Sequence, residues 1–398
     1  MTVYFIDGWD WGTELNLTPS STNNPQKYVD YSSGGGNSIQ PGRQPSGQPG
    51  GGNSIEFGNA AFRQTCATRF VGATPATLVL GFAYRPGAVR PNSSVVRIES
   101  GHATLVNPGS FDDGTNEGTV IWLWQQTDGT MKVVAGDGTQ CGTPNFPGTV
   151  LATLNTTFAP NVWRYIELVA SASGWSVYVD DVLDTAQSVA LPVGAGMDRY
   201  SFIHFTFESC RIDDHYAADT RLGPCRVTGS PPAVGSTHQW APLAGTNLSQ
   251  VHEFGNLGTP TPDGDTTYVA SSNAGDLDLY QMTATACYGR VLAVALNASG
   301  RAAVSSPSVN LMFKALGNLF TIGSGASMGG VYRVSQAVAA LNPSNSSTWT
   351  DSAITGSLFG YQMASGGTAR VTQFFIEKLV SLRNMSFDCG QGSYGFSS

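Results

Sequence analysis

The stretch Trp163–Leu183, WRYIELVASASGWSVYVDDVL, decides the fold. It holds two apolar runs rich in aromatic and β-branched residues, and a turn of small residues, ASASG, separates them. Strand-forming residues bounded by small turn formers predict a β-hairpin. In the second run Trp175, Val177 and Val179 lie on one face, because side chains alternate along a strand. We expect this hairpin at the centre of a two-sheet jelly roll.

The first half of the chain repeats this strand pattern. Residues 77–84, TLVLGFAY, form a nearly continuous apolar run, as expected of a strand buried on both faces. Residues 120–134 place an Asp-Gly turn signal between two apolar runs, which predicts another hairpin. Residues 18–54 are rich in Gly and Pro and predict a long loop or arm. Roughly a dozen strands and no convincing helix predict an all-β jelly-roll sandwich of two sheets over residues 1–222.

The second half has a different organisation. Residues 223–265 contain several prolines and few apolar runs, so we expect a linker and extended segment there. Residues 266–398 show further strand patterns and predict a second, smaller β-sandwich domain. Within them, TARVTQFFIEKLVSL at 368–382 allows a long strand or an amphipathic helix, and its β-branched and aromatic content favours the strand. Residues 348–354 predict a capped turn or single helical turn.

Composition and charge narrow the class of protein. The chain has 48 Gly and 21 Pro but only 12% charged residues, which is common in extracellular or particle-bound β proteins. Its net charge is −8 and it has no Lys/Arg cluster, which argues against a nucleic-acid partner. No apolar run approaches ~20 residues, so we expect no membrane partner. The N-terminus shows no secretory signal, so we expect synthesis in the cytoplasm and release, if any, by a route such as lysis.

The sequence offers no catalytic constellation. Its adjacent acidic pairs are Asp112-Asp113, Asp180-Asp181 and Asp213-Asp214. Neighbouring side chains on a strand face opposite ways, so none of these pairs forms the carboxylate dyad of a glycosidase. We interpret Asp180 and Asp181 as hairpin-turn residues. The five histidines show no metal-binding spacing, and no nucleophile elbow occurs. We therefore predict no catalytic residue and a non-enzymatic protein.

Six cysteines are present, and their spacings match no zinc or CxxC pattern. We predict that they are buried thiols that behave as small hydrophobes. Cys210 and Cys225 are the one pair close enough in sequence to suggest a local disulfide bridge.

Several of these segments together resemble known families. The first domain resembles the concanavalin A-like lectin/glucanase sandwich, in its laminin-G-like branch. That resemblance rests on GNSIEF at 52–57, the strand Thr77–Pro86, the hairpin at 163–183, and IDDHY at 212–216. The combination of FIDGWDW at 5–11, DTTYV at 265–269 and ARVTQFFIE at 369–377 further resembles structural proteins of tailed bacteriophages.

The resemblance implies an architecture and a location. It implies a virion protein that decorates a tail or capsid and works with other virion proteins and with copies of itself, so we expect a homo-oligomer. It supplies no catalytic residue. Proteins of this kind also attach to host surfaces, which makes cell-surface polysaccharide a candidate partner.

Two kinds of ligand site have candidates in the sequence. Exposed aromatic side chains stack on sugars, and Trp9, Trp11, Trp122 and Trp124 are the candidates. Trp122 and Trp124 share one face of a strand, and that face is either a binding surface or part of a core. Lectin-like sandwiches often hold Ca²⁺ with loop carboxylates. The metal candidates are Asp112, Asp113, Asp263 and Asp265, and the alternative is that these acids lie in ordinary turns.

These observations lead to three functional hypotheses. The leading hypothesis is a non-enzymatic structural protein of the phage virion that acts through protein assembly and glycan binding. The alternative is a lectin that recognises host polysaccharide as a receptor-binding component. A glycan hydrolase is the third and weakest hypothesis, because the sequence lacks a suitable pair of carboxylates.

Overall fold

The structure is a computed structural model of the 398-residue chain. The part of the chain that it describes comprises residues 1–8, 30–32, 38–41, 53–57, 65–70, 73–89, 93–100, 118–135, 149–193, 196–204, 209–251, 265, 267–285 and 289–383.

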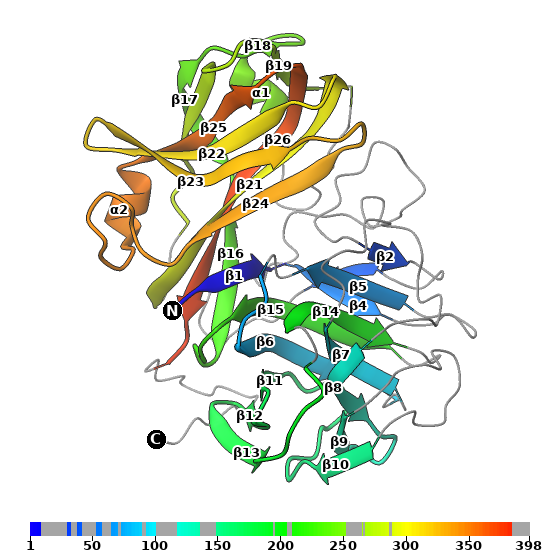
Figure 1. Ribbon diagram of the computed structural model, residues 1–398. Coiled ribbons are helices and arrows are strands. Elements are labelled where there is room, and N and C mark those ends of the chain that lie inside the picture. Colours follow the sequence, from blue (N-terminus) through cyan, green and yellow to red (C-terminus); the bar gives the residue numbers. More distant parts are fainter. Residues whose placement is uncertain are drawn as a thin grey trace. The chain divides into compact units, whose positions relative to one another are not determined.

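The chain divides into two compact units, and both are built almost entirely of antiparallel strands (Figure 1). Unit 1 comprises Met1–Tyr4, Tyr28–Cys225 and Arg383–Ser398, and unit 2 comprises Phe5–Lys27 and Arg226–Leu382. The all-β prediction is thus confirmed. Among the described residues, no helix has the length and apolar character needed to cross a membrane.

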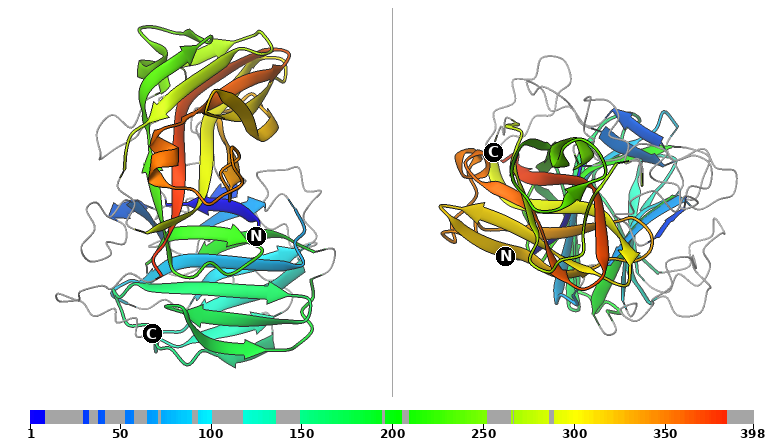
Figure 2. Two further views of the ribbon diagram at one scale, coloured as in Figure 1. Left: turned by 90° about the vertical axis from the view of Figure 1, so that its left-hand side faces the viewer. Right: turned by 90° about the horizontal axis from the view of Figure 1, so that it is seen from above.

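Unit 1 contains two sheets. The eight-stranded sheet runs β13 (Val182–Gln187), β12 (Gly174–Val179), β11 (Arg164–Ser171), β6 (Thr77–Pro86), β15 (Cys210–Ala218), β4 (Asn53–Phe57) and β3 (Ser38–Pro41), and β1 (Val3–Asp7) also pairs with β15. The seven-stranded sheet runs β10 (Thr149–Thr153), β9 (Met131–Ala135), β8 (Gly118–Gln125), β7 (Ser93–Ser100), β14 (Met197–His204), β5 (Thr65–Phe70) and β2 (Asp30–Ser32). The left view of Figure 2 shows these strands, coloured blue to green, side by side.

Apolar side chains from the two sheets meet between them. The ring of Phe82 on β6 packs edge-on against Phe202 on β14, with centroids 5.2 Å apart. Within the eight-stranded sheet, Leu80 on β6 and Leu168 on β11 are paired in register, and both side chains are buried. Two sheets joined by interdigitating inner faces form a sandwich, as predicted.

The hairpin at 163–183 forms, but its predicted central position is wrong: β11 and β12 lie toward one edge of the eight-stranded sheet, with only β13 beyond β12. β11 and β12 pair from Ile166 with Val179 to Ser171 with Gly174. Asp180 and Asp181 connect β12 to β13, and their φ angles of 49° and 69° are positive, as in the tight turns that join antiparallel strands. Their interpretation as turn residues is therefore confirmed. Asp180 Oδ1 also accepts a hydrogen bond of 2.8 Å from the backbone N–H of Tyr165, which fixes the turn against β11.

Asp184 on β13 holds the loop that follows β10. Its carboxylate accepts hydrogen bonds from the backbone N–H groups of Asn155 at 2.7 Å and Thr156 at 2.8 Å, and from Thr185 Oγ1 at 2.7 Å. Partial burial raises the pKa of Asp184, but hydrogen bonds from Thr156, Thr185 and Asn155 outweigh this and leave the pKa below its usual value.

Replacing Asp184 with asparagine tests this carboxylate. Because the folded pKa is depressed, Asp184 stabilises unit 1 above its unfolded pKa, and this contribution is lost as the pH falls through the folded pKa. We expect Asp184→Asn to cost no more than about 1 kcal/mol at neutral pH. Urea unfolding should show the difference shrinking toward about pH 3. A difference that is independent of pH would contradict this role.

Unit 2 contains the other two sheets. The six-stranded sheet runs β18 (Ala241–Pro242), β19 (Val269–Ser271), β26 (Thr368–Ser381), β21 (Arg290–Val304) and β24 (Arg333–Ala339), and β16 (Cys225–Ser230) also pairs with β26. The five-stranded sheet runs β17 (Pro232–His238), β20 (Leu277–Met282), β25 (Leu358–Ser365), β22 (Ser308–Ala315) and β23 (Asn318–Ser327). The described helices are α1 (Asn247–Val251) and α2 (Asp351–Thr355).

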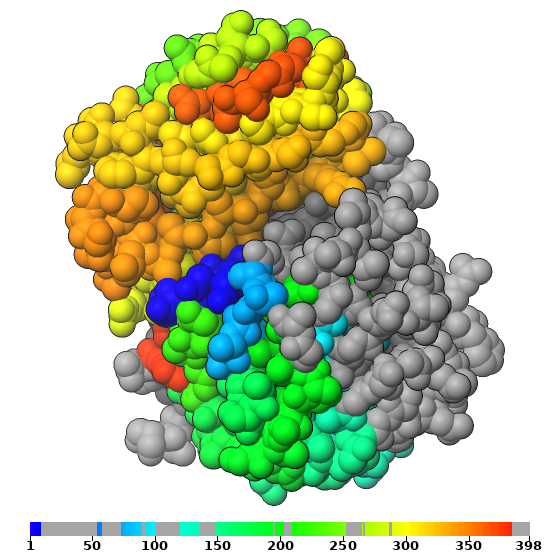
Figure 3. Space-filling model, in the orientation of Figure 1, coloured from blue at the N-terminus to red at the C-terminus, as the bar shows by residue number. Residues whose placement is uncertain are grey.

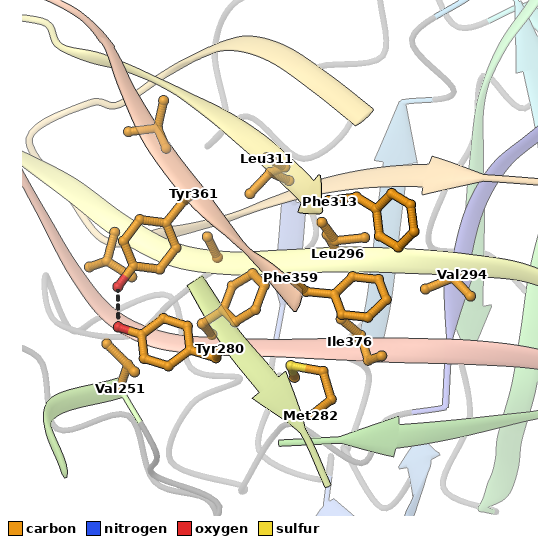
Figure 4. Close-up of a cluster of buried hydrophobic side chains, with 14 of the residues drawn as sticks. Val251, Tyr280, Met282, Val294, Leu296, Leu311, Phe313, Phe359, Tyr361 and Ile376 are labelled. Atoms are coloured by element: carbon orange, nitrogen blue, oxygen red, sulfur yellow. Dashed lines mark hydrogen bonds between the residues drawn. The ribbon is translucent and has the colours of Figure 1, made fainter. Parts of the chain in front are cut away.

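A single apolar cluster joins these two sheets (Figure 4). The ring of Phe313 packs against Phe359, with centroids 5.2 Å apart, and edge-on against Trp349 at the same distance. Leu296 on β21 and Ile376 on β26 are cross-strand neighbours in this cluster and are fully buried. Unit 2 is therefore a second sandwich with its own core.

Local patterns also predicted two details of unit 2. Residues 368–381 form the long strand β26 rather than a helix, in agreement with their β-branched and aromatic content. The predicted helical turn is α2, where Thr350 Oγ1 caps the helix by accepting from the N–H of Ala353 at 3.1 Å.

Cys210 and Cys225 are both buried thiols, as predicted, and the local bridge between them is not formed. Burial raises the pKa of the Cys210 thiol far above its usual value, so this sulfur stays protonated and unreactive. The Cys225 thiol lies 3.2 Å from the carbonyl oxygen of Gly223.

Candidate functional site: the arginine pair of unit 2

Two arginines lie directly opposite each other in unit 2. Arg301 on β21 and Arg370 on β26 are cross-strand partners in the antiparallel ladder. Ala369 and Val371 on either side of Arg370 belong to the core, so alternation places Arg370 on the outer face of the sheet. Like charges directly opposite each other destabilise a sheet. This pair therefore needs a compensating group.

Asp265 supplies the compensating charge. Its Oδ1 accepts from Arg301 Nε at 3.2 Å and from Arg370 Nη1 at 2.8 Å, and its Oδ2 accepts from Arg301 Nη2. Arg301 thus binds the carboxylate through both arms of its guanidinium fork, a geometry that selects carboxylates. One carboxylate faces two guanidinium groups, so the cluster keeps a net charge of about +1 at neutral pH.

Two tyrosines frame the arginines. The Arg370 guanidinium carbon lies 4.3 Å from the ring centroid of Tyr268, and that of Arg301 lies 5.3 Å from the ring centroid of Tyr332. Both distances are within the range of cation–π attraction. Tyr332 also donates a hydrogen bond of 2.9 Å from its hydroxyl to Asp265 Oδ1. We call Asp265, Tyr268, Arg301, Tyr332 and Arg370 the arginine-pair cluster.

The ionisation states in this cluster are firmly set. Partial burial raises the pKa of Asp265, but hydrogen bonds from Arg301, Arg370 and Tyr332 outweigh it and the pKa lies below its usual value. Burial, together with the neighbouring Asp265, raises the pKa of Tyr332 well above its usual value. At neutral pH Asp265 is therefore charged and Tyr332 is a neutral donor.

The cluster is open to solvent at its charged centre. The Asp265 side chain is 40% exposed, whereas those of Arg301 and Arg370 are 23% and 26% exposed. The hairpin that joins β25 to β26, drawn in deep orange, reaches the surface of unit 2 in Figure 3. A small group in solution can therefore reach the carboxylate and the guanidinium groups that bind it.

Further polar groups continue along the same strands. Two residues along β21 from Arg301, Ser299 is opposite Gln373 of β26 in register. Both side chains are fully buried, and within the described part of the chain Ser299 Oγ and both amide atoms of Gln373 have no hydrogen-bond partner. Buried polar groups without a protein partner are usually satisfied by ordered water or by a ligand.

Sequence reasoning named Asp265 as a candidate calcium ligand, with an ordinary turn as the alternative, and did not identify its arginine partners. The structure shows Asp265 binding two arginines and a tyrosine hydroxyl. Arg301 and Arg370 are 36 and 105 residues away from Asp265 along the chain. The register between β21 and β26 places the two arginines opposite each other. The sequence alone does not give that register.

The predicted tryptophans Trp122 and Trp124 lie together on β8 of unit 1. Their ring centroids are 6.2 Å apart, and the side chains are only 2% and 3% exposed. They pack with Val134 in a small cluster, and the Arg97 guanidinium lies 5.5 Å from the Trp122 ring. Both indoles are therefore buried in this structure. Their role as sugar-binding residues stays a prediction.

Arginines also surround a carboxylate beside these tryptophans. Glu99 is fully buried and forms ion pairs with Arg97 and Arg199, whose side chains are 3% and 13% exposed. The charges in this group are enclosed, unlike those of the arginine-pair cluster, so the latter is the better candidate for binding a ligand from solution.

The other predicted site residues, Trp9, Trp11, Asp112, Asp113 and Asp263, lie outside the described residues. Among the residues that are described, no three histidine, cysteine or acidic side chains gather in a way that would hold a metal ion. The calcium site stays a prediction.

Comparisons with known proteins give distant structural similarities. No protein-family model and no curated protein matches the chain. Cellulose induced protein Cip1 matches with a TM-score of 0.36 and 10% identity over 55% of this chain and 99% of its own. The carbohydrate esterase vb_24B_21 of the Shiga toxin-encoding bacteriophage phi24B matches with a TM-score of 0.31 and 12% identity over 55% of this chain and 100% of its own.

A sialidase matches with a TM-score of 0.29 and 13% identity over 44% of this chain, and this chain spans only 16% of that protein. Alginate lyase Aly36B is another similar structure. The prediction of a non-enzymatic protein is corrected by these findings, because a sialidase, a lyase and an esterase are among the proteins with similar structures.

Proposed function

We propose that this protein recognises glycans as a component of a tailed-phage particle, and that the arginine-pair cluster of unit 2 contacts the sugar. The observation that carries the proposal is a solvent-accessible group of two arginines and a carboxylate framed by tyrosine rings. Guanidinium groups donate hydrogen bonds to the oxygens of sugars, and the two tyrosine rings hold the guanidinium groups in place.

The position on a phage particle is supported by the sequence. The segments FIDGWDW, DTTYV and ARVTQFFIE resemble those of phage structural proteins, and two of them contain residues of the cluster. Asp265 and Tyr268 belong to DTTYV, and Arg370 belongs to ARVTQFFIE. In this proposal other virion proteins and further copies of the chain are the assembly partners, and host-surface polysaccharide is the ligand.

Loss of Arg370 is the direct test of glycan recognition. We expect the full chain to bind a subset of bacterial surface glycans on an array, and Arg370→Ala to weaken that binding by about tenfold or more. Arg333→Ala is the matched control, because Arg333 is an exposed arginine of the same sheet outside the cluster. Binding that both variants retain equally would contradict the site, and the absence of binding to any glycan would contradict the function.

The location on the particle needs a separate test. An antibody against the purified protein should label virions in electron micrographs at a reproducible position. The same protein should elute from gel filtration as an oligomer if it assembles with copies of itself. Unlabelled particles together with a monomeric protein would overturn this part of the proposal.

A further inference from the structure

The contacts of Asp265 resemble those of a bound ligand more than those of a structural ion pair. Its carboxylate receives four hydrogen bonds, from Arg301 twice, from Arg370 and from the Tyr332 hydroxyl. The two arginines come from the sheet, and Tyr332 lies immediately before β24. Asp265 itself lies outside the strands, before β19. The groups that bind the carboxylate therefore belong to the sheet or lie directly next to it. The carboxylate itself comes from a segment outside the strands.

From this arrangement we infer that the arginine pair is a receptor for the carboxylate of an acidic sugar, and that Asp265 is an internal ligand which such a sugar displaces. The inference rests on the proposed glycan-binding function and adds the chemical class of the glycan. A uronic acid and a sialic acid both present a planar carboxylate on a ring, and both match the guanidinium fork of Arg301.

Displacement of Asp265 is feasible energetically. Ion pairs at a partly exposed site contribute little to stability, because water and salt compete with them. Asp265 is 40% exposed, so its carboxylate can move into water without an unpaired charge being buried. The incoming carboxylate would restore the same hydrogen bonds, and its sugar ring would add contacts that Asp265 does not make.

The tyrosines keep the receptor in place during this exchange. The ring of Tyr268 beside Arg370 and that of Tyr332 beside Arg301 restrain the two guanidinium groups independently of Asp265. A receptor that is already ordered loses less conformational entropy on binding. The repulsion between the opposed arginines also favours binding of an anion whenever Asp265 is absent.

The experiment removes the internal ligand. Calorimetric titration of the full chain would use trigalacturonate and 3′-sialyllactose as acidic probes, and methyl-esterified trigalacturonate as a probe without the charge. We expect Asp265→Ala and Asp265→Asn to bind one acidic probe roughly tenfold more tightly than the unmodified chain, equivalent to about 1.4 kcal/mol. The probe that gains affinity distinguishes a uronate from a sialate. Arg370→Ala added to Asp265→Ala should abolish the gain.

The outcomes separate this inference from the proposed function. If Asp265→Ala and Asp265→Asn both remain folded by circular dichroism and neither gains affinity for an acidic probe, the internal-ligand inference is wrong. An equal gain for the esterified probe would also overturn it. Glycan binding on the array that depends on Arg370 would still support the proposed function in both cases. If the array shows no such binding, the function itself fails.

Discussion

Replacing Arg221 with methionine should lower the free energy of unfolding of unit 1 by about 3 kcal/mol, because it leaves a buried carboxylate without its cation. Arg221 donates from Nε at 2.9 Å and from Nη2 at 2.6 Å to Oε2 of Glu167, which is only 1% exposed. Methionine keeps much of the length of the side chain and removes the charge. The effect therefore reports the loss of the guanidinium, which also pairs with Asp181 and lies 3.4 Å from the Tyr178 ring centroid.

Glu167 matters because it joins several segments of unit 1. Its Oε1 accepts a hydrogen bond of 2.8 Å from the N–H of Gly223 and another from the Tyr216 hydroxyl at 2.5 Å. Tyr216 in turn lies over Gly81 of β6, where an added Cβ would come within 2.1 Å of the tyrosine ring. The carboxylate thus ties β11 to β15 and to the segment that follows β15.

Hydrogen exchange during urea unfolding measures this effect. Amides of β11 and β15 report unit 1 separately from unit 2, which is necessary because a chain with two cores need not unfold in one step. Arg211→Met is the control, since the Arg211–Glu56 pair is 23% exposed on both sides and should contribute about 0–1 kcal/mol. Equal losses for Arg211→Met and Arg221→Met would show that Glu167 does not need its cation.

A second variant tests the cause of the loss. Glu167→Gln in the Arg221→Met background removes the orphaned charge while keeping an acceptor for Tyr216 and Gly223. We expect this double variant to recover part of the stability that Arg221→Met loses, because the cost of a broken buried pair is largely that of the charge left behind. A further loss would show that the network of hydrogen bonds, and not the charge, dominates.

The contrast between what the sequence predicted and what it missed has a physical basis. The hairpin at 163–183, the strand at 368–382 and the helical turn α2 were predicted correctly, because strand alternation and capping depend on neighbours within a few residues. The overall class of two β-sandwiches follows from many such local patterns repeated along the chain.

The positions of the charged site residues depend on contacts between segments that are far apart in the sequence. Arg301 and Arg370 are unremarkable as single charges in the sequence, and their opposition arises from a register that includes bulges between β21 and β26. Arg221 likewise reaches Glu167 across 54 residues. A bulge shifts the partner of every residue beyond it, so no local pattern could place these side chains together.

Replacing Asp278 with alanine should destabilise unit 2 by about 3 kcal/mol or more, because it removes a buried carboxylate that accepts four hydrogen bonds. Asp278 on β20 is fully buried. Its Oδ1 accepts from the N–H groups of Gln239 at 2.8 Å and Trp240 at 3.1 Å. Its Oδ2 accepts from Asn247 Nδ2 at 2.8 Å and from the Tyr280 hydroxyl at 3.0 Å.

These contacts hold a long connection against the five-stranded sheet. Gln239 and Trp240 follow β17, and Asn247 begins α1, so one carboxylate anchors the whole segment between β17 and α1. The Tyr280 hydroxyl also lies 3.1 Å from that of Tyr361, as the dashed line in Figure 4 shows. Without Asp278, the Tyr280 hydroxyl therefore keeps only its hydrogen bond with the Tyr361 hydroxyl.

Two further substitutions make the test specific. Asp276→Ala removes a partly exposed carboxylate from the turn just before β20, where Asp276 accepts from Ser271 Oγ at 2.6 Å, and it should cost only about 1 kcal/mol. Asp278→Asn keeps one acceptor oxygen and should be intermediate. Urea unfolding would give the free energies, and hydrogen exchange at the Gln239 and Trp240 amides would report release of the segment. A loss for Asp278→Ala no larger than that for Asp276→Ala, with both amides still protected, would mean that packing of the Trp240 ring against Tyr361 holds this segment without the carboxylate.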